Sequence, residues 1–360
     1  MANNTGTLQL LGSHLRKLNV QAASNWSPWA DDSLQLLWHL TSLEVLTISC
    51  PISQTRQDVR LAGITALACL RDLRLSAHSN TVVLQLGEAD CPQHLSRLQH
   101  LARVRLALTV PWEQLRHLPA LQTLKQKSGH VELPCDLHHC SSLTRLDMQS
   151  DSVLGHVPAL NDLCNLRDLR WINAALAPGA LRPLWQFVRS ATALTTLSLW
   201  HMPYDEFCCS DLARLSSLCH LSMSRHINRV VVLGDVKFPS SLIKLESLEL
   251  TSMGISTLVM PSSLTALKCL DLRGNKLACV PPSLFSLTQL TYLNLSWQKC
   301  PLELDCPVRL DVARWPCLQH LRIQQGGLRI PSGWYFRNLE VLEENQSASS
   351  AVGRHIDIDF

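Results

Sequence analysis

The residue types best suited to chemistry gather in one short segment, which reads Cys135-Asp136-Leu137-His138-His139-Cys140. Thiolates and imidazoles are ligands that zinc prefers, so this segment is the first candidate for a metal site. Zinc sites usually draw on two separated pairs of ligands, however, and this segment offers only one group. Cys140 also falls in a series of apolar residues at every third position, where a small thiol packs well. We therefore expect neither a metal nor another cofactor.

The chain has 14 cysteines, and none of them forms a Cys-x-x-Cys motif. The adjacent Cys208 and Cys209, or Cys300 with Cys306, are candidates for redox switching. The apolar run near the N-terminus covers only residues 8–11, which is too short for a secretory signal. Reduced, packed thiols are then the simpler interpretation, and the sequence predicts a cytoplasmic protein.

Sequence motifs of catalysis are missing. The chain contains no Gly-x-x-x-x-Gly-Lys, no Gly-x-Ser-x-Gly and no His-Glu-x-x-His. Its 32 basic and 29 acidic residues leave a net charge of +3, which does not indicate nucleic-acid binding. No run of 18 apolar residues occurs, so we expect no membrane span. These observations together predict a protein that is not an enzyme.

Leucines are the elements that organise the chain, and their spacing repeats. In the clearest segment, Leu267, Leu270, Leu272, Asn275 and Leu277 follow one another at steps of three, two, three and two. This spacing predicts a short strand, whose first leucine we call the anchor, followed by a tight bend. The pattern recurs with anchors at Leu18, Leu46, Leu73, Val104, Leu124, Leu146, Leu169, Leu197, Leu221, Leu248, Leu270, Leu293, Leu321 and Leu342.

The recurring pattern resembles the leucine-rich-repeat superfamily, from about residue 8 to residue 345, with about 14 units. The resemblance implies an α/β solenoid shaped as a horseshoe. A parallel β-sheet lines its concave face, and short helices, 3-10 turns or loops cover its convex face. It implies a single domain over residues 1–345. The segment after it is polar and contains no anchor, so we expect a flexible tail over residues 346–360.

The chain departs from the family pattern at the bend. In the family, an asparagine five residues after the anchor hydrogen-bonds the neighbouring bend, and here only Asn275 holds that position. We expect an irregular array whose other bends are satisfied by backbone groups or water. Gln126 and Glu344 stand where a second inward leucine belongs, so the register of those two units is in question.

Residues between and beside the inward leucines are expected to point out of the concave face, because side chains alternate across a strand. Basic residues cluster there in units three to seven, partly offset by Asp72, Asp147 and Asp168. Exposed strand positions of any soluble protein favour charged residues, and that remains the alternative. The candidate partner-binding residues are Arg74, Arg103, Arg105, Lys125, Lys127, Arg145, Arg170, Trp200, His201, His220 and Arg225.

The function that follows is a protein-binding scaffold or recognition module, with Trp200 as an aromatic anchor for a partner of acidic character. Two alternatives stay open. One is the recognition arm of a larger system, such as a ubiquitin-ligase receptor or an immune sensor. The other, which rests on the family resemblance alone, is a structural component of a cytoskeletal or axonemal assembly.

Overall fold

The computed structural model describes residues 14–21, 37, 39–50, 57–60, 64–77, 82–85, 97–104, 118–127, 137, 140–150, 160, 163–173, 182–202, 204, 208–225, 233–298, 315–323 and 341–344. The chain divides into two compact units, unit 1 over residues 1–187 and unit 2 over residues 188–360. The expected single domain over residues 1–345 stays a prediction. The expected tail, residues 346–360, lies outside the described residues.

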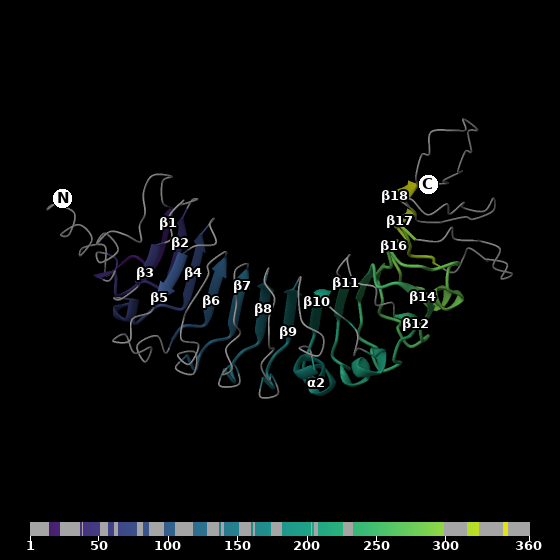
Figure 1. Ribbon diagram of the computed structural model, residues 1–360, viewed down its shortest axis with the longest axis horizontal. Coiled ribbons are helices and arrows are strands. Elements are labelled where there is room, and N and C mark those ends of the chain that lie inside the picture. The colour runs from purple at the N-terminus through teal and green to yellow at the C-terminus, as the bar shows by residue number, and fades with distance from the viewer. Residues whose placement is uncertain are drawn as a thin grey trace. The chain divides into compact units, whose positions relative to one another are not determined.

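Unit 1 contains seven parallel strands that pair in the order in which the chain makes them (Figure 1). They are β1 (Lys17–Gln21), β2 (Val45–Cys50), β4 (Asp72–Ala77), β6 (His100–Val104), β7 (Thr123–Lys127), β8 (Arg145–Ser150) and β9 (Asp168–Asn173). Strands β3 (Gln57–Arg60) and β5 (Val82–Gln85) form a separate parallel pair. A 3-10 turn, η2 (Ile64–Ala66), precedes β4, and the boundary between the units falls within helix α2 (Arg182–Ser190).

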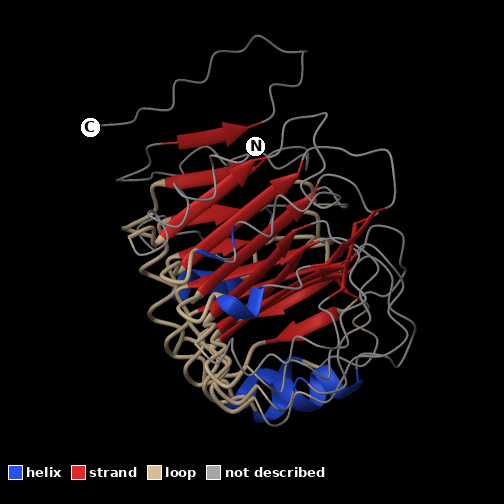
Figure 2. Ribbon diagram, turned by 90° about the vertical axis from the view of Figure 1, so that its left-hand side faces the viewer, coloured by secondary structure: helices blue, strands red, loops and turns tan. Residues whose placement is uncertain are grey.

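Unit 2 likewise stacks seven parallel strands of the main sheet, and Figure 2 shows the strands running side by side. They are β10 (Thr196–Met202), β11 (His220–Arg225), β13 (Ser247–Thr251), β15 (Cys269–Asp271), β16 (Tyr292–Asn294), β17 (His320–Ile323) and β18 (Val341–Glu344). A second parallel pair consists of β12 (Gly234–Lys237) and β14 (Ile255–Val259). The 3-10 helices η6 (Cys209–Arg214) and η7 (Pro282–Ser286) precede main-sheet strands.

The repeated leucine spacing forms the core because each leucine falls at an inward position of one turn. Leu40, Leu43, Leu46 and Ile48 are completely buried, and the amide of Leu43 donates to the carbonyl of Leu40 at 2.9 Å. A hydrogen bond over three residues is the 3-10 pattern, so the first two leucines lie on a tight turn and the next two on β2. Burying each such side chain contributes about 1.5–3 kcal/mol. The predicted spacing thus specifies the local structure.

The strand register confirms 13 of the 14 expected anchors and shows that Val104 was wrong. Leu101 pairs with Leu73 of β4 and with Leu124 of β7, so Leu101 is the anchor of β6. The sequence offered two registers there, because Val104 with Leu106 also has the two-residue spacing of an inward pair. Backbone pairing with the two neighbouring strands selects the other one. Gln126 does stand at the second inward position of β7, opposite Met148, so the register that was in question there is the one that follows from the anchor Leu124.

Asn275 holds the bend after β15 as the family pattern implies. Its side-chain oxygen accepts from the amides of Met253 (3.0 Å) and Ile255 (3.2 Å). Its side-chain nitrogen donates to the carbonyls of Leu250 and Leu272, both at 2.7 Å. One buried amide therefore satisfies four backbone groups of two successive turns.

Gln298 performs the same task in the next turn, which the sequence interpretation missed. Its Nε2 donates to the carbonyls of Leu272 (2.9 Å) and Leu295 (3.3 Å), and its Oε1 accepts from the amide of Leu277 at 3.1 Å. The expectation that every bend except that of Asn275 relies on backbone or water is therefore wrong here. A glutamine carries the same amide on a longer stem.

In four turns of unit 2, the fourth residue after the anchor lies in the left-handed region. These residues are His201 (φ 59°), Ser252 (57°), Gly274 (72°) and Trp297 (61°). Only Gly274 is a glycine, and a Cβ added there would lie 2.6 Å from Oγ of Ser252. The same left-handed conformation therefore recurs at one position of these turns, and at residue 274 a close neighbour requires glycine as well.

Candidate functional site

The sheet of each unit has one face turned away from the leucine core, which we call the strand face. On unit 1 this face carries ion pairs of aspartate with arginine or lysine. Asp168 accepts from Arg170, two residues on in β9, at 3.1 Å and lies 3.4 Å from Arg145 of β8. Lys125 of β7 lies 3.4 Å from Asp147, its partner in register on β8. Each of these predicted cations is therefore paired with an aspartate, and Asp168 links Arg145 to Arg170.

Arg74 makes the tightest of these pairs. Its guanidinium donates two hydrogen bonds to the carboxylate of Asp72, at 2.6 and 3.1 Å. The hydrogen bond, and after it the charge of Asp72, raise the pKa of Arg74. The tripeptide Asp-Leu-Arg produces this pair because residues two apart share one face of a strand, and the same tripeptide recurs at 168–170. The repeated tripeptide is therefore a sequence signal for an ion pair on one face of the strand.

The ion pairs form two layers. The carboxylates of Asp72, Asp147 and Asp168 are only 8–18% exposed, whereas the cationic side chains are 32–60% exposed. Arginine and lysine are long enough to reach past the short aspartates while their stems cover neighbouring strands. A partner that approaches the strand face of unit 1 therefore meets cations first, with the carboxylates recessed beneath them.

The structure does not place the remaining basic candidates of unit 1 among the ion pairs of the strand face. The register puts Arg103 opposite Leu75 and Gln126, in the inward column, because the anchor of β6 is Leu101. The expectation that Arg103 belongs to the outward columns of the sheet is therefore contradicted by the pairing. Lys127 ends β7 in register with Gln149, and Arg105 lies outside the described residues.

On unit 2, a chain of hydrogen bonds fixes an exposed tryptophan. Trp200 of β10 is 40% exposed, and its Nε1 donates to Oγ of Ser222 on β11 at 2.7 Å. The hydroxyl of Ser222 in turn donates to Oε2 of Glu249 on β13, also at 2.7 Å. The indole is thus held in one orientation by groups on three adjacent strands, and the half-buried Ser222 and Glu249 set that orientation.

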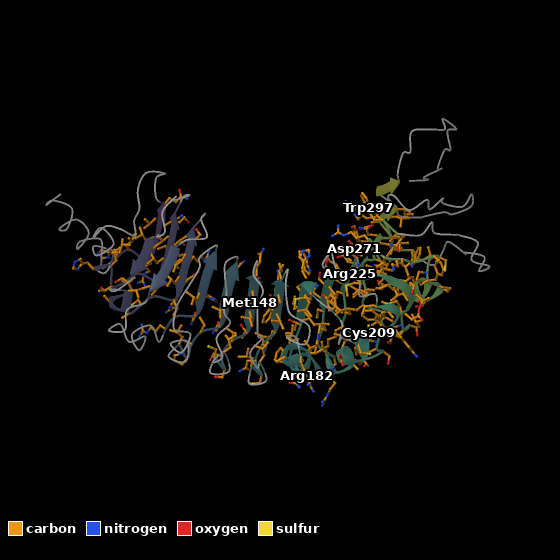
Figure 3. The ribbon with its side chains drawn as sticks, in the orientation of Figure 1. Met148, Arg182, Cys209, Arg225, Asp271 and Trp297 are labelled. Carbon is orange, nitrogen blue, oxygen red and sulfur yellow. The ribbon has the colours of Figure 1, made fainter. Side chains whose placement is uncertain are left out.

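The other candidates of unit 2 flank this chain. His201 follows Trp200 in the left-handed conformation, and His220 is exposed at the start of β11, in register with Thr196 and Ser247. Arg225 is half-buried at the end of β11. Figure 3 shows Arg225, Asp271 and Trp297 on the strand-face side of unit 2, with Cys209 on the side of the 3-10 helices. Trp297 is 50% exposed.

Three short polar residues in the central column of the strand face, Asp147, Asp271 and Asn294, are buried, which corrects the expectation that these positions are exposed. Asp271 accepts from the amide of Arg273 at 3.0 Å and from Nδ2 of Asn294 at 3.2 Å. Burial raises the pKa of Asp271 more than these hydrogen bonds lower it. The longer Arg74, Lys125 and Arg170 of the same column are 32–60% exposed, so side-chain length contributes to the depth of a residue in this column.

An aromatic and cationic group follows on β16 and β17. The guanidinium of Arg322 lies 5.7 Å from the ring centre of Tyr292, and the ring of His320 lies 6.4 Å from the same ring. Both separations are within or close to the range of cation–π and aromatic contacts. Together with the Trp200 chain, this group gives the strand face of unit 2 an aromatic character that the described strand face of unit 1 does not share.

Metal and thiol chemistry find little support in the described part of the chain. No group of three or more histidine, cysteine, aspartate or glutamate side chains is placed there to hold a metal ion. Of the candidate zinc segment, Cys135, His138 and His139 lie outside the described residues. Burial raises the pKa of Cys140 to about 11, and burial, followed by the charges of Cys208 and Asp211, raises that of Cys209 to about 12. Thiols with such values are poor nucleophiles.

The stacked parallel strands, the buried leucine columns and the 3-10 turns give both units the leucine-rich-repeat fold. Comparison with solved structures agrees with this fold. An internalin of Listeria monocytogenes is 17% identical with a TM-score of 0.57, over 88% of this chain and 84% of its own. A leucine-rich-repeat protein of Leptospira interrogans is 18% identical with a TM-score of 0.53, over 88% and 86%.

The complex of TLR13 with the RNA ssRNA13 is also similar, at 18% identity and a TM-score of 0.56, over 91% of this chain and 46% of TLR13. Identities this low show the fold alone. No protein-family model matches the chain, and comparison with curated proteins gave no match. Within the described residues, no helix is long and apolar enough to cross a membrane.

Proposed function

We propose that the protein is a non-catalytic recognition module that binds a protein partner through the strand faces of its repeats. The observation that carries this proposal is the oriented tryptophan of unit 2. Trp200 is exposed, and Ser222 and Glu249 fix its indole through two hydrogen bonds of 2.7 Å. Large aromatic side chains that lose little freedom on binding are typical interface hot spots.

Residues around Trp200 support a protein interface on the same face. Trp200 pairs in register with Ser224 of β11, and Arg225 follows at the end of that strand. Tryptophan and arginine are enriched among interface hot spots, and small hydroxyl residues beside them leave room for a partner's side chain. The proposal includes the expected cytoplasmic location, which is supported by free thiols at Cys69, Cys164, Cys208, Cys209, Cys219, Cys269 and Cys317.

Site-specific photo-crosslinking tests the proposal. A photoreactive amino acid at Ser224 is expected to capture one or a few defined proteins in the native cell. The same group at Ile243, which is exposed in the turn before β13 and outside the strands, is the matched control. Trp200→Ala should weaken capture about 30-fold or more, as expected for loss of a hot spot worth about 2 kcal/mol or more.

Two outcomes would contradict the proposal. Equal adducts from positions 224 and 243 would show that capture does not depend on the strand face. Unchanged capture by the Trp200→Ala variant would remove the tryptophan from the interface. Trp200→Phe keeps a ring but loses the hydrogen bond to Ser222, so it should lie between the wild type and the alanine variant.

A further inference from the structure

The strand face of unit 1 carries an excess of cations in a defined arrangement. Its described side chains include four cations that are paired with aspartates, namely Arg74, Lys125, Arg145 and Arg170. They also include Lys17, which is exposed at the start of β1. These five cations stand against three carboxylates, those of Asp72, Asp147 and Asp168. The face therefore has two positive charges more than negative ones.

The recessed carboxylates position the cations rather than cancel them for a partner. Asp168 contacts both Arg145 and Arg170 and so links two cations on adjacent strands, while Asp147 contacts Lys125 as a separate pair. Because each carboxylate is less exposed than its cations, the exposed arginine and lysine groups keep donors that the aspartates do not use. Arginine has five donors, and one aspartate uses at most two of them in one pair.

We infer that this face binds an acidic polypeptide segment, whose aspartate or glutamate carboxylates pair with the outer donors of Arg74, Lys125, Arg145 and Arg170. The inference rests on the proposed function and specifies one partner chemistry for it. The five strands from β4 to β9 span about 19 Å at a strand spacing of about 4.8 Å. An extended segment of about six residues covers that distance.

A polypeptide fits better than a single-stranded nucleic acid. Proteins that bind single strands stack the bases on aromatic side chains beside a basic groove. Among the described residues on this face, His100 is the one aromatic ring, at the start of β6. The three recessed carboxylates would also oppose a chain with a phosphate at every step, whereas a peptide can place its charges at alternate residues.

Fluorescence anisotropy with labelled hexaglutamate tests the inference on the full chain, with hexathymidylate as the competing probe. The wild type should bind hexaglutamate more tightly than hexathymidylate, and binding should weaken when salt rises from about 50 to about 200 mM. Arg74→Gln with Arg170→Gln should weaken hexaglutamate binding about tenfold, because two partly exposed charge pairs are lost. Arg74→Lys with Arg170→Lys keeps both charges and should stay within about threefold.

Arg189→Gln is the matched control. Arg189 pairs with Asp211 at 2.8 Å and is similarly exposed, but it lies on helix α2 and not on a sheet. Its loss should change hexaglutamate binding less than twofold, the scale of a distant surface charge. Melting curves check the folding of every variant, and Lys125→Gln gives an independent reading, with an expected loss of about threefold, if the double variant unfolds.

The inference is overturned if hexaglutamate does not bind, if hexathymidylate binds more tightly, or if Arg189→Gln costs as much as the double variant. Failure of this inference is distinguishable from failure of the proposed function. Trp200→Ala should leave hexaglutamate binding unchanged, because Trp200 belongs to unit 2. If hexaglutamate does not bind while crosslinking from position 224 still captures a partner, the inference of an acidic segment fails and the proposed function stands.

Discussion

The carbonyl oxygen of Leu272 accepts hydrogen bonds from both Asn275 Nδ2 (2.7 Å) and Gln298 Nε2 (2.9 Å). A carbonyl has two lone pairs, and here each serves an amide from a different turn. The two side chains therefore connect three successive turns of unit 2 through one shared acceptor. Side-chain amides thus hold two successive bends, although only the first of them, at Asn275, has the asparagine of the family pattern. We call this pair of amides the amide ladder.

Asn275→Ala should lower the free energy of unfolding by about 2–4 kcal/mol, because four buried backbone groups lose their partners. Hydrogen exchange checks this directly, since the amides of Met253 and Ile255 should lose protection. Asn165→Ala is the matched control, because that side chain donates to Ser141 at the surface and its loss should cost about 0.5 kcal/mol or less. Equal losses in the two variants would contradict the ladder.

Gly274→Ala should destabilise unit 2 by about 1–3 kcal/mol, through the left-handed φ and the approach of the new Cβ to Oγ of Ser252. A double-mutant cycle with Ser252→Gly separates these causes. The second change removes the hydroxyl, so the double variant should recover at least about 0.5 kcal/mol beyond the sum of the single effects. Strict additivity in denaturant unfolding would show that the close approach costs nothing.

Two carboxyl groups of unit 2 should affect stability in opposite directions as pH changes. Burial, the largest cause, raises the pKa of Asp271 in the fold. Its contribution to stability is therefore complete below the unfolded value of about 3.9 and is lost as pH rises through the folded pKa. The hydrogen bond from Lys268, the largest cause, lowers the pKa of Glu246. That contribution is present above the unfolded value of about 4.3 and is lost as pH falls.

Melting temperatures at about pH 3.5 and about pH 7 check both signs. At the lower pH, the melting temperature of the wild type should rise relative to that of Asp271→Asn. Relative to Glu246→Gln, it should fall. An advantage over Asp271→Asn that grows with pH would show that the hydrogen bonds from Arg273 and Asn294 outweigh burial.

Much of the fold could be predicted from leucine spacing, because burial in these turns depends on few residues at fixed positions. Spacing failed at Val104, because Val104 and Leu106 form an apolar pair whereas the inward positions of β6 hold Leu101 and Arg103, and only pairing with β4 and β7 shows this. It failed at Gln298 because the asparagine rule was applied by residue name, whereas the bend requires an amide that can reach.

The candidate site could be predicted less well. Sequence placed Arg74, Lys125, Arg145 and Arg170 among the exposed cations, and the structure describes all four on the strand face. The solvent exposure of each side chain was not predictable from the alternation of side chains along a strand. Alternation tells which face of the sheet a side chain lies on, and not how far it extends from that face. The recessed aspartates depend on the length of neighbouring side chains across strands, which a single repeat does not contain.

The shared acceptor at Leu272 also limits where the chain can tolerate insertions and deletions. The distance from anchor to amide is five residues both from Leu270 to Asn275 and from Leu293 to Gln298. The step between anchors, in contrast, is 23 residues from Leu270 to Leu293 and 28 from Leu293 to Leu321. Length can therefore vary between the bend and the next strand, while a single residue added between strand and bend would displace the amide from its acceptors.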